Sequence, residues 1–141
     1  MSINRMIPLK SKNKIKILVL EDNPMNQKLA GLMLADWDFT YDIFSNGKRA
    51  LEAANFDTYD LILMDIQMPE LDGYETTAYI RKKLKMKLPI IAMTAHAMPG
   101  EKEKCLKAGM TNYISKPIDE AELLSLINSH LLSNTLKTQK I

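Results

Sequence analysis

The sequence predicts an α/β protein with a doubly wound (βα)5 fold, in which helices cover both faces of a five-stranded parallel sheet. Three short runs rich in Ile, Val, Leu and Met, with two further short strand-like segments, alternate along the chain with segments of helical apolar spacing. Continuous apolar runs are typical of parallel strands, which are buried on both faces. The chain has 141 residues, 46% of them hydrophobic, which is enough for one domain with a core.

The first half of the chain contains two strand–helix pairs. Ile15–Leu20 (IKILVL) is an apolar run that predicts a buried strand. Asn23 and Pro24 supply an N-cap and a first-turn proline, which together predict the start of a helix. The elements predicted here are a strand at 15–20, a helix from 24 to about 37, a strand at 40–44, and a short helix after the Asn46-Gly47 turn, ending near Ala54.

The second half continues the alternation. Gly109 follows a helical pattern directly and is a typical C′ residue, so it predicts a helix end. The elements predicted here are strands at 60–64, 88–94 and 111–115, and helices from 74 to about 86, at 98–108 and at 119–132.

The charge is unevenly distributed. The net charge is +2, but residues 1–16 carry +5 and residues 134–141 carry +2, which leaves −5 on the body between them. A basic tail can contact nucleic acid or an acidic membrane, but a solvated tail is the simpler interpretation. We therefore expect a disordered basic tail at 1–14, the folded domain at 15–132 and a frayed C-terminal tail at 133–141.

Composition excludes several classes of protein. A single cysteine, Cys105, excludes an intrachain disulfide and a cysteine-rich metal site. No apolar run approaches the roughly 20 residues that a membrane helix needs. The N-terminus has no apolar segment typical of a cleaved signal peptide. These observations predict a cytoplasmic protein that does not insert into a membrane.

Polar residues follow four of the predicted strands. Glu21 and Asp22 come after the first strand, Asp65 after the third, Thr94 after the fourth and Lys116 after the fifth. In doubly wound folds the ligand site lies beyond the carboxyl ends of the strands, near a switch in strand order. We therefore expect these five side chains to converge.

Three carboxylates at one sheet edge need compensating positive charge, because a pair 4 Å apart repels by about 4 kcal/mol at an effective dielectric near 20. Lys116 supplies one unit, and Mg²⁺ suits a site with few carboxylates and several waters. Asp65, the central carboxylate, is a candidate nucleophile towards phosphorus. Lys116 and the cation would neutralise phosphoryl oxygens, and Thr94 offers a hydroxyl to one of them.

Four segments carry a resemblance to a known family: LVLEDNPMNQ (18–27), LILMDIQMPELDGYE (61–75), IIAMTAHAM (90–98) and CLKAGMTNYISKPI (105–118). They resemble the receiver domains of response regulators in two-component signalling, over about residues 15–132. The motifs occur in the family's order and spacing, and their wording is most similar to receivers of hybrid sensor histidine kinases.

The resemblance implies a flavodoxin-like fold and a role for each site residue. Asp38 stands where many relatives have glycine, so a left-handed backbone is expected there. The Lys116–Pro117 peptide is expected to be cis. The implied roles are Asp65 as phosphoacceptor, Asp22, Asp65 and the Gln67 backbone carbonyl as ligands to Mg²⁺ (or Mn²⁺), Glu21 as a ligand through a metal-bound water, Thr94 and Lys116 as groups that bind phosphoryl oxygens, and Thr94 with Tyr113 as the switch pair.

The expected function is that of a phosphorylation-dependent switch rather than an ordinary enzyme. The resemblance implies that a histidine kinase or histidine phosphotransfer domain donates the phosphoryl group, and that the domain promotes its own phosphorylation and dephosphorylation. The surface formed by the helix at 98–108, the strand at 111–115 and the last helix would change. The expected partner surface comprises Met25, Asn26, Leu29, Pro117 and Ile118.

Two other classes of protein were weighed. A magnesium-dependent phosphatase with an aspartate nucleophile usually has a second acid two residues later, and position 67 is Gln. An FMN-binding module would need glycine-rich phosphate loops, and the chain has five glycines in all and no GxGxxG or GxxxxGK motif. Direct nucleic-acid binding is not expected. The oligomeric state, and whether the domain stands alone or belongs to a hybrid kinase, stay open.

Overall fold

A computed structural model describes residues 15–95 and 98–139. Within these residues, no helix combines the length and apolar character needed to cross a membrane. The elements in chain order are β1 (Lys16–Leu20), α1 (Pro24–Asp36), β2 (Thr40–Phe44), α2 (Gly47–Ala53), the 3₁₀ helix η3 (Phe56–Thr58), β3 (Leu61–Asp65), α3 (Gly73–Lys82), β4 (Ile90–Thr94), α4 (Glu101–Ala108), β5 (Asn112–Ser115) and α5 (Glu120–Gln139).

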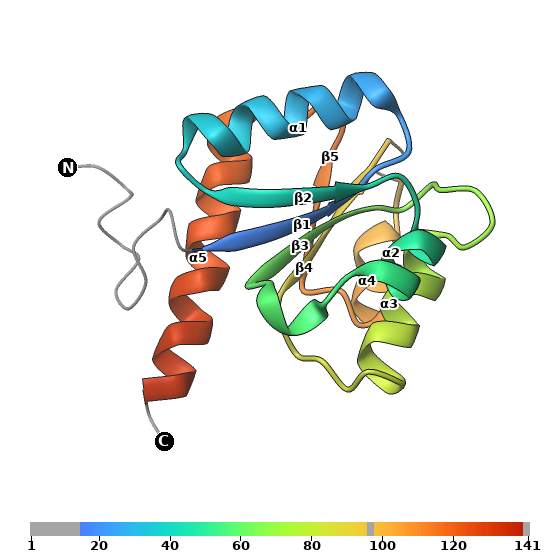
Figure 1. The fold of residues 1–141 in the computed structure, drawn as a ribbon. Coiled ribbons are helices and arrows are strands. Elements are labelled where there is room, and N and C mark those ends of the chain that lie inside the picture. The colour runs from blue at the N-terminus through green and yellow to red at the C-terminus, as the bar shows by residue number, and fades with distance from the viewer. Residues whose placement is uncertain (1–14, 96–97, 140–141) are drawn as a thin grey trace.

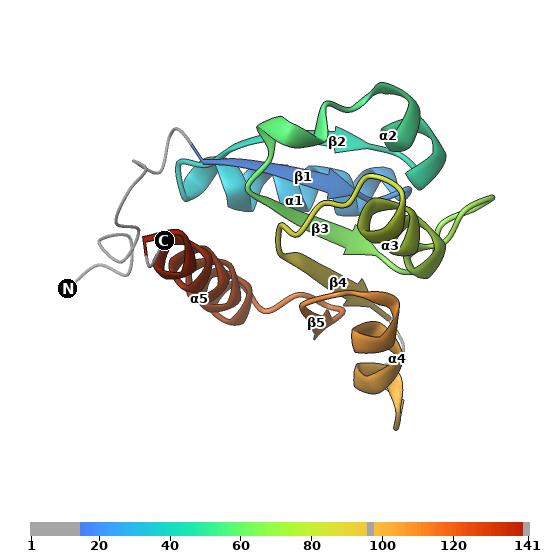
Figure 2. The same cartoon turned by 90° about the horizontal axis from the view of Figure 1, so that it is seen from below.

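The five strands form one parallel sheet in the order β2-β1-β3-β4-β5. Helices α1 and α5 cover one face, and α2, α3 and α4 cover the other (Figures 1 and 2). The strand order reverses at β1, because β2 lies on one side of it and β3, β4 and β5 lie on the other. The doubly wound fold predicted from the sequence is therefore confirmed.

Alternation along the strands divides the core into two clusters. In β1, Ile17 and Val19 belong to the cluster under α1 and α5. Leu18 and Leu20 belong to the cluster on the other face, which includes Ala50 of α2, Ile80 of α3 and Cys105 of α4. Every residue of β3 and β4 is buried, as expected for central parallel strands. These strands form a rigid base for the residues at their carboxyl ends.

Local signals set several helix ends. The Asn23 side chain accepts hydrogen bonds from the amides of Met25 (2.9 Å) and Asn26 (3.1 Å), as an N-cap should. At the start of α3, Asp72 and Glu75 form a reciprocal capping box. Gly109 ends α4 with φ of 105°, as predicted from the sequence.

Other boundaries differ from the predicted ones. α3 ends at Lys82 instead of near Met86, and Lys85 then has a left-handed φ of 55°. β4 begins at Ile90 because Pro89 has no N–H to donate. α4 begins at Glu101 and not at Met98, because Gly100 before it has a φ of 89°. The 3₁₀ helix η3 was not predicted.

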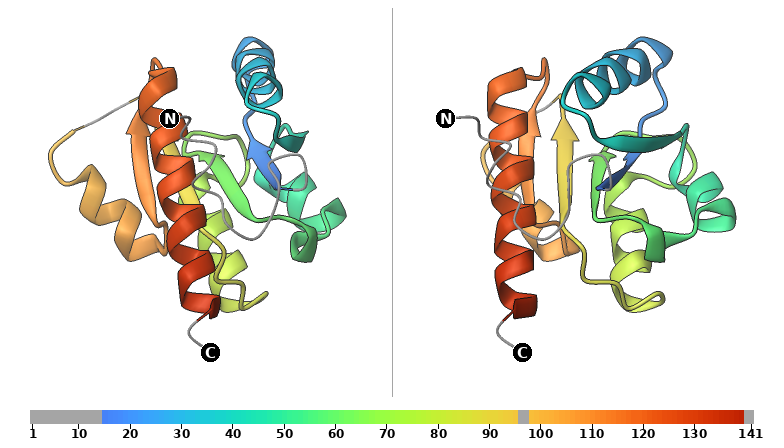
Figure 3. Two further views of the ribbon diagram at one scale, coloured as in Figure 1. Left: turned by 90° about the vertical axis from the view of Figure 1, so that its left-hand side faces the viewer. Right: turned by 60° about the vertical axis from the view of Figure 1, so that its left-hand side comes forward.

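The C-terminal helix is longer than predicted. α5 continues past the expected end at Leu132 to Gln139, and its full length is seen in Figure 3. No glycine or proline occurs between Glu120 and Gln139, so the sequence contains no helix-ending residue there. The helix therefore covers most of the predicted frayed tail at 133–141. The predicted basic tail at 1–14 lies outside the described residues.

Two backbone expectations are confirmed. Asp38, just after α1, has a left-handed φ of 64°, a conformation that Asp tolerates better than most residues. The Lys116–Pro117 peptide bond is cis.

Candidate functional site

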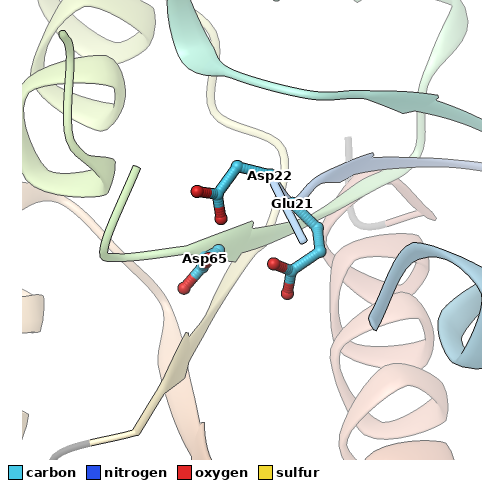
Figure 4. A group of neighbouring side chains, drawn as sticks. All are labelled: Glu21, Asp22 and Asp65. Carbon is cyan, nitrogen blue, oxygen red and sulfur yellow. The ribbon is translucent and has the colours of Figure 1, made fainter. Parts of the chain in front are cut away.

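The carboxyl ends of β1 and β3 bring three acidic side chains together. Glu21 and Asp22 follow β1, and Asp65 is the last residue of the neighbouring strand β3. One carboxylate oxygen from each residue lies within 4.8 Å of the other two (Figure 4). The predicted convergence of the three acids is therefore observed, and their oxygen atoms form a donor set suited to a hard divalent cation.

Glu21 is fixed in a buried position by groups from three segments. Its side chain is 1% exposed, and its Oε2 accepts a hydrogen bond from the Asn23 amide at 3.1 Å. Its Oε1 lies 2.9 Å from the Lys116 ammonium. The Gln27 side chain donates to the Glu21 backbone carbonyl at 2.6 Å. Sequence reasoning assigned no role to Gln27, although it lies inside the first motif.

Asp65 shares the same lysine. Its Oδ1 lies 3.4 Å from the Lys116 ammonium and accepts a hydrogen bond from the Gln67 amide at 3.3 Å. Burial, followed by the negative charge of Glu21, raises the pKa of Asp65 to about 7, although Lys116 and the Gln67 amide act in the opposite direction. Burial alone would lower the pKa of Lys116, but its two carboxylate partners raise it overall. An additional cation would relieve this crowding of negative charge.

Asp22 and Gln67 lie on the solvent side of the cluster. Both residues are exposed, whereas Glu21 and Asp65 are buried. A metal bound between these oxygens could therefore keep several waters, as Mg²⁺ usually does. The residues present fit such an ion in ligand chemistry and in charge.

Thr94 ends β4 and is 2% exposed. Its hydroxyl donates a hydrogen bond to Glu101 Oε1 of α4 at 3.1 Å, a contact that sequence reasoning did not predict. Its carbonyl accepts a hydrogen bond from the Lys116 amide at 2.7 Å, which ties the loop after β5 to the end of β4.

Tyr113 lies on β5 opposite Ala92 of β4 and is half-buried against the cluster under α3 and α4. Ala92 and Thr94 are two residues apart on one strand, so their side chains point to the same face of the sheet. Tyr113 and Thr94 therefore share a face, as the predicted switch pair requires.

The predicted partner surface combines exposed apolar side chains with the part-buried Asn26 and Ile118. Met25 and Leu29 of α1 are 65% and 50% exposed. A groove between α1 and the segment after β5 has a volume of about 510 Å³, and Asn26, Leu29, Pro117 and Ile118 line it. Leu32, which is 60% exposed and also lines this groove, was missed from the sequence.

Comparison with known sequences gives a consistent result. A family model described as the response regulator receiver domain matches residues 17–128. The chain is 42% identical over 127 residues to the signal transduction histidine-protein kinase BarA of Escherichia coli K12, covering 88% of the chain and 14% of BarA. It is 47% identical over 124 residues to hybrid signal transduction histidine kinase I of Dictyostelium discoideum, covering 82% and 7%. The chain thus spans less than one sixth of either relative.

Two similar solved structures bear on the site. One is a receiver domain of a sensor histidine kinase from Pseudomonas aeruginosa with magnesium coordinated in its active-site cleft, at 39% identity and a TM-score of 0.74, covering 83% of this chain and 97% of that one. The other is from the complex of the Saccharomyces cerevisiae phosphotransfer protein Ypd1 with the receiver domain of Ssk1, at 30% identity and a TM-score of 0.77, covering 86% and 91%.

Proposed function

The chain belongs to the response regulator receiver domain family, the signalling switches of phosphorylation-dependent phosphorelays, and on that premise we propose that Asp65 is its phosphoacceptor. One observation carries the proposal: the Lys116 ammonium reaches both Glu21 and Asp65, at 2.9 and 3.4 Å, inside a cluster of three carboxylates. The oxygen that we propose as the nucleophile therefore lies beside the Lys116 ammonium, and a positive charge at this position would stabilise phosphoryl transfer.

In the proposed reaction, an Asp65 oxygen attacks the phosphorus of a phosphohistidine. The P–N bond breaks, an acyl phosphate forms on Asp65, and the donor imidazole leaves with its electron pair and takes up a proton. Lys116 neutralises negative charge on the phosphoryl oxygens, and the Thr94 hydroxyl donates to one of them. A bound divalent cation would supply the remaining charge neutralisation.

The proposed metal ligands are Asp22, Asp65 and the Gln67 backbone carbonyl, with Glu21 acting through a metal-bound water. Support comes from the three clustered carboxylates and from the magnesium-bound receiver structure from P. aeruginosa. The ligands are all oxygen atoms, so Mn²⁺ would also fit.

The domain is a signalling switch, and the proposal adds that it promotes its own phosphorylation and dephosphorylation. The groups that stabilise transfer to Asp65 are also available when water attacks the acyl phosphate. The alternative of an aspartate-nucleophile phosphatase has no support, because the Gln67 amide can neither donate nor accept a proton as a general acid or base. We place the reaction in the cytoplasm, where ATP-derived phosphohistidine is made.

The proposed partner is a histidine kinase or a histidine phosphotransfer domain, and nucleic acid is not a proposed partner. The kinase or phosphotransfer domain would dock on a surface that borders the phosphorylation site and combines exposed apolar side chains with a groove. This surface comprises Met25, Asn26, Leu29, Pro117 and Ile118. The Ypd1–Ssk1 structure supports a phosphotransfer domain as this class of partner.

Asp65→Asn tests the phosphoacceptor. Wild-type protein should incorporate phosphate from acetyl phosphate with Mg²⁺ and not with EDTA, and hydroxylamine should release the phosphate. Asp65→Asn should lose incorporation, whereas Asp57→Asn, an exposed acid in η3, should behave like wild type. Normal hydroxylamine-sensitive labelling of folded Asp65→Asn would refute the assignment.

Leu29→Glu tests the partner surface. Phosphotransfer from the histidine protein should fall by about tenfold or more, the effect of about 1.4 kcal/mol of lost docking free energy. Labelling by acetyl phosphate should be unchanged. Leu106→Glu is the matched control, because Leu106 is similarly exposed (47%, against 50% for Leu29) but lies on α4. Equal phosphotransfer rates for the two variants would exclude this surface.

A further inference from the structure

The Thr94 hydroxyl is already engaged in the unphosphorylated protein. Its oxygen lies 3.1 Å from Glu101 Oε1, and the Thr94 side chain is almost fully buried. A hydroxyl group carries one proton and can donate one hydrogen bond at a time. Donation to a phosphoryl oxygen on Asp65 therefore competes with the bond to Glu101.

Glu101 also lies near Tyr74 of α3. It is the first residue of α4, and burial, followed by the nearby Glu101 carboxylate, raises the pKa of Tyr74 near the start of α3. The Lys104 ammonium lies 4.7 Å from the centre of the Tyr74 ring. The Glu101 carboxylate thus joins the end of β4 to the first turn of α4.

The Glu101 carboxylate does not need Thr94 to be stable. A negative charge in the first turn of a helix is favoured by the helix dipole, and the Glu101 side chain is only partly buried. Loss of the Thr94 bond would therefore leave the Glu101 carboxylate at the helix N-terminus and partly exposed to solvent. The Thr94 hydroxyl can move between two acceptors without leaving a buried charge behind.

We infer that Glu101 is a positioning residue that holds the Thr94 hydroxyl away from the phosphorylation site and sets the threshold for switching. The inference rests on the proposed function, in which Thr94 donates to a phosphoryl oxygen. When Asp65 is phosphorylated, the Thr94 hydroxyl donates its hydrogen bond to a phosphoryl oxygen instead of to Glu101. The link between β4 and α4 is then broken. α4 is thereby released by a route separate from any movement of Tyr113.

The test uses beryllofluoride with Mg²⁺, a mimic of the phosphoryl group on Asp65, with its affinity measured by NMR titration. Glu101→Ala should bind it about five- to tenfold more tightly than wild type, because a competing hydrogen bond to a charged acceptor is lost. Glu101→Gln should show a smaller gain, because its amide oxygen still accepts from Thr94. Glu103→Ala removes an equal charge from the same helix turn and should bind like wild type.

A double-mutant cycle separates hydrogen bonding from simple charge repulsion. In a Thr94→Ala background, Glu101→Ala should give no further gain in affinity, because the proton that Glu101 competes for is absent. Should Glu101→Ala fail to fold, the cycle with Glu101→Gln gives the same comparison with a smaller effect.

Wild-type affinity in Glu101→Ala, an equal gain in Glu101→Gln and Glu101→Ala, or a gain that persists without the Thr94 hydroxyl would each overturn the inference. Failure of the proposed function looks different. In that case wild-type protein would not bind beryllofluoride, or Asp65→Asn would bind it equally well.

Discussion

Glu21 and Asp65 lie at the carboxyl ends of the neighbouring strands β1 and β3, whereas Thr94 and Tyr113 lie on β4 and on the edge strand β5. Both acids are buried and share Lys116, and Glu21 is also fixed by the amide of Asn23. We refer to Glu21, Asp22, Asp65 and Lys116 as the acidic corner.

The other side of the site, which we refer to as the switch side (Thr94, Glu101 and Tyr113), is held differently. The Thr94 hydroxyl bonds to the Glu101 carboxylate of α4, and Tyr113 is only half-buried on β5. Only one of the four residues of β5 is fully buried, compared with all five of β3. The difference teaches that the two buried acids are each held by several groups at once, while Thr94 and Tyr113 are held by contacts that can be exchanged.

The largest expected effect comes from removing the positive charge of Lys116 from the acidic corner. Lys116→Met leaves the Glu21 and Asp65 carboxylates buried without their ammonium partner, so the free energy of unfolding in EDTA at pH 8 should fall by about 3 kcal/mol. Saturating Mg²⁺ should restore part of the loss, because the cation replaces positive charge. Urea denaturation measures both values.

Lys48→Met is the matched control for this experiment. The Lys48–Glu70 ion pair is 3.6 Å long with both side chains over 60% exposed, so its loss should cost less than about 1 kcal/mol. Equal losses in the free energy of unfolding for Lys116→Met and Lys48→Met would show that the ion pairs of the acidic corner stabilise the fold no more than an exposed ion pair does.

A smaller effect would separate metal binding from folding within the acidic corner. Asp22 is exposed, so Asp22→Asn should change the metal-free free energy of unfolding by less than about 0.5 kcal/mol. Its affinity for Mg²⁺ should fall by about tenfold or more, because a charged oxygen ligand is lost. Calorimetric titration measures the affinity, and unchanged Mg²⁺ binding would remove Asp22 from the ligand set.

The smallest expected effect on the rate of phosphorylation comes from a substitution on the switch side. Tyr113→Ala should leave the rate of labelling by acetyl phosphate within about twofold of wild type, because Tyr113 is not part of the acidic corner. The amide shifts that beryllofluoride induces in α4 should fall by about half, since one of the two proposed routes to α4 is lost. Loss of labelling together with loss of the shifts would mean that the two sides of the site are not separable.

The features that could be predicted from the sequence are those that the geometry of the parallel sheet determines. Strands β1, β3 and β4 could be predicted because burial on both faces requires continuous apolar runs. The acidic corner could be predicted because parallel strands bring their carboxyl ends to one edge. Both features depend on sheet geometry, which is shared by all doubly wound folds.

The features that could not be predicted depend on how helices and loops sit on the sheet. The contact between Glu101 and Thr94 requires α4 to begin at a particular place relative to β4, and Gly100 determines that start. The early end of α3 is stabilised by Arg81, whose guanidinium donates to the carbonyls of Met86 and Leu88. No local sequence pattern specifies side-chain contacts that join separate elements in this way.

The ion pair between Glu21 and Lys116 joins residues that are 95 positions apart in the chain. β5 is both the last strand in sequence and the outermost strand beside β4, so Lys116 reaches the site only when the whole sheet is assembled. During synthesis, a nascent chain that already contains Asp65 would still lack the Lys116 ammonium that lies beside the Asp65 carboxylate. The pairing of Lys116 with Glu21 and Asp65 is therefore complete only in a chain whose fifth strand has joined the sheet.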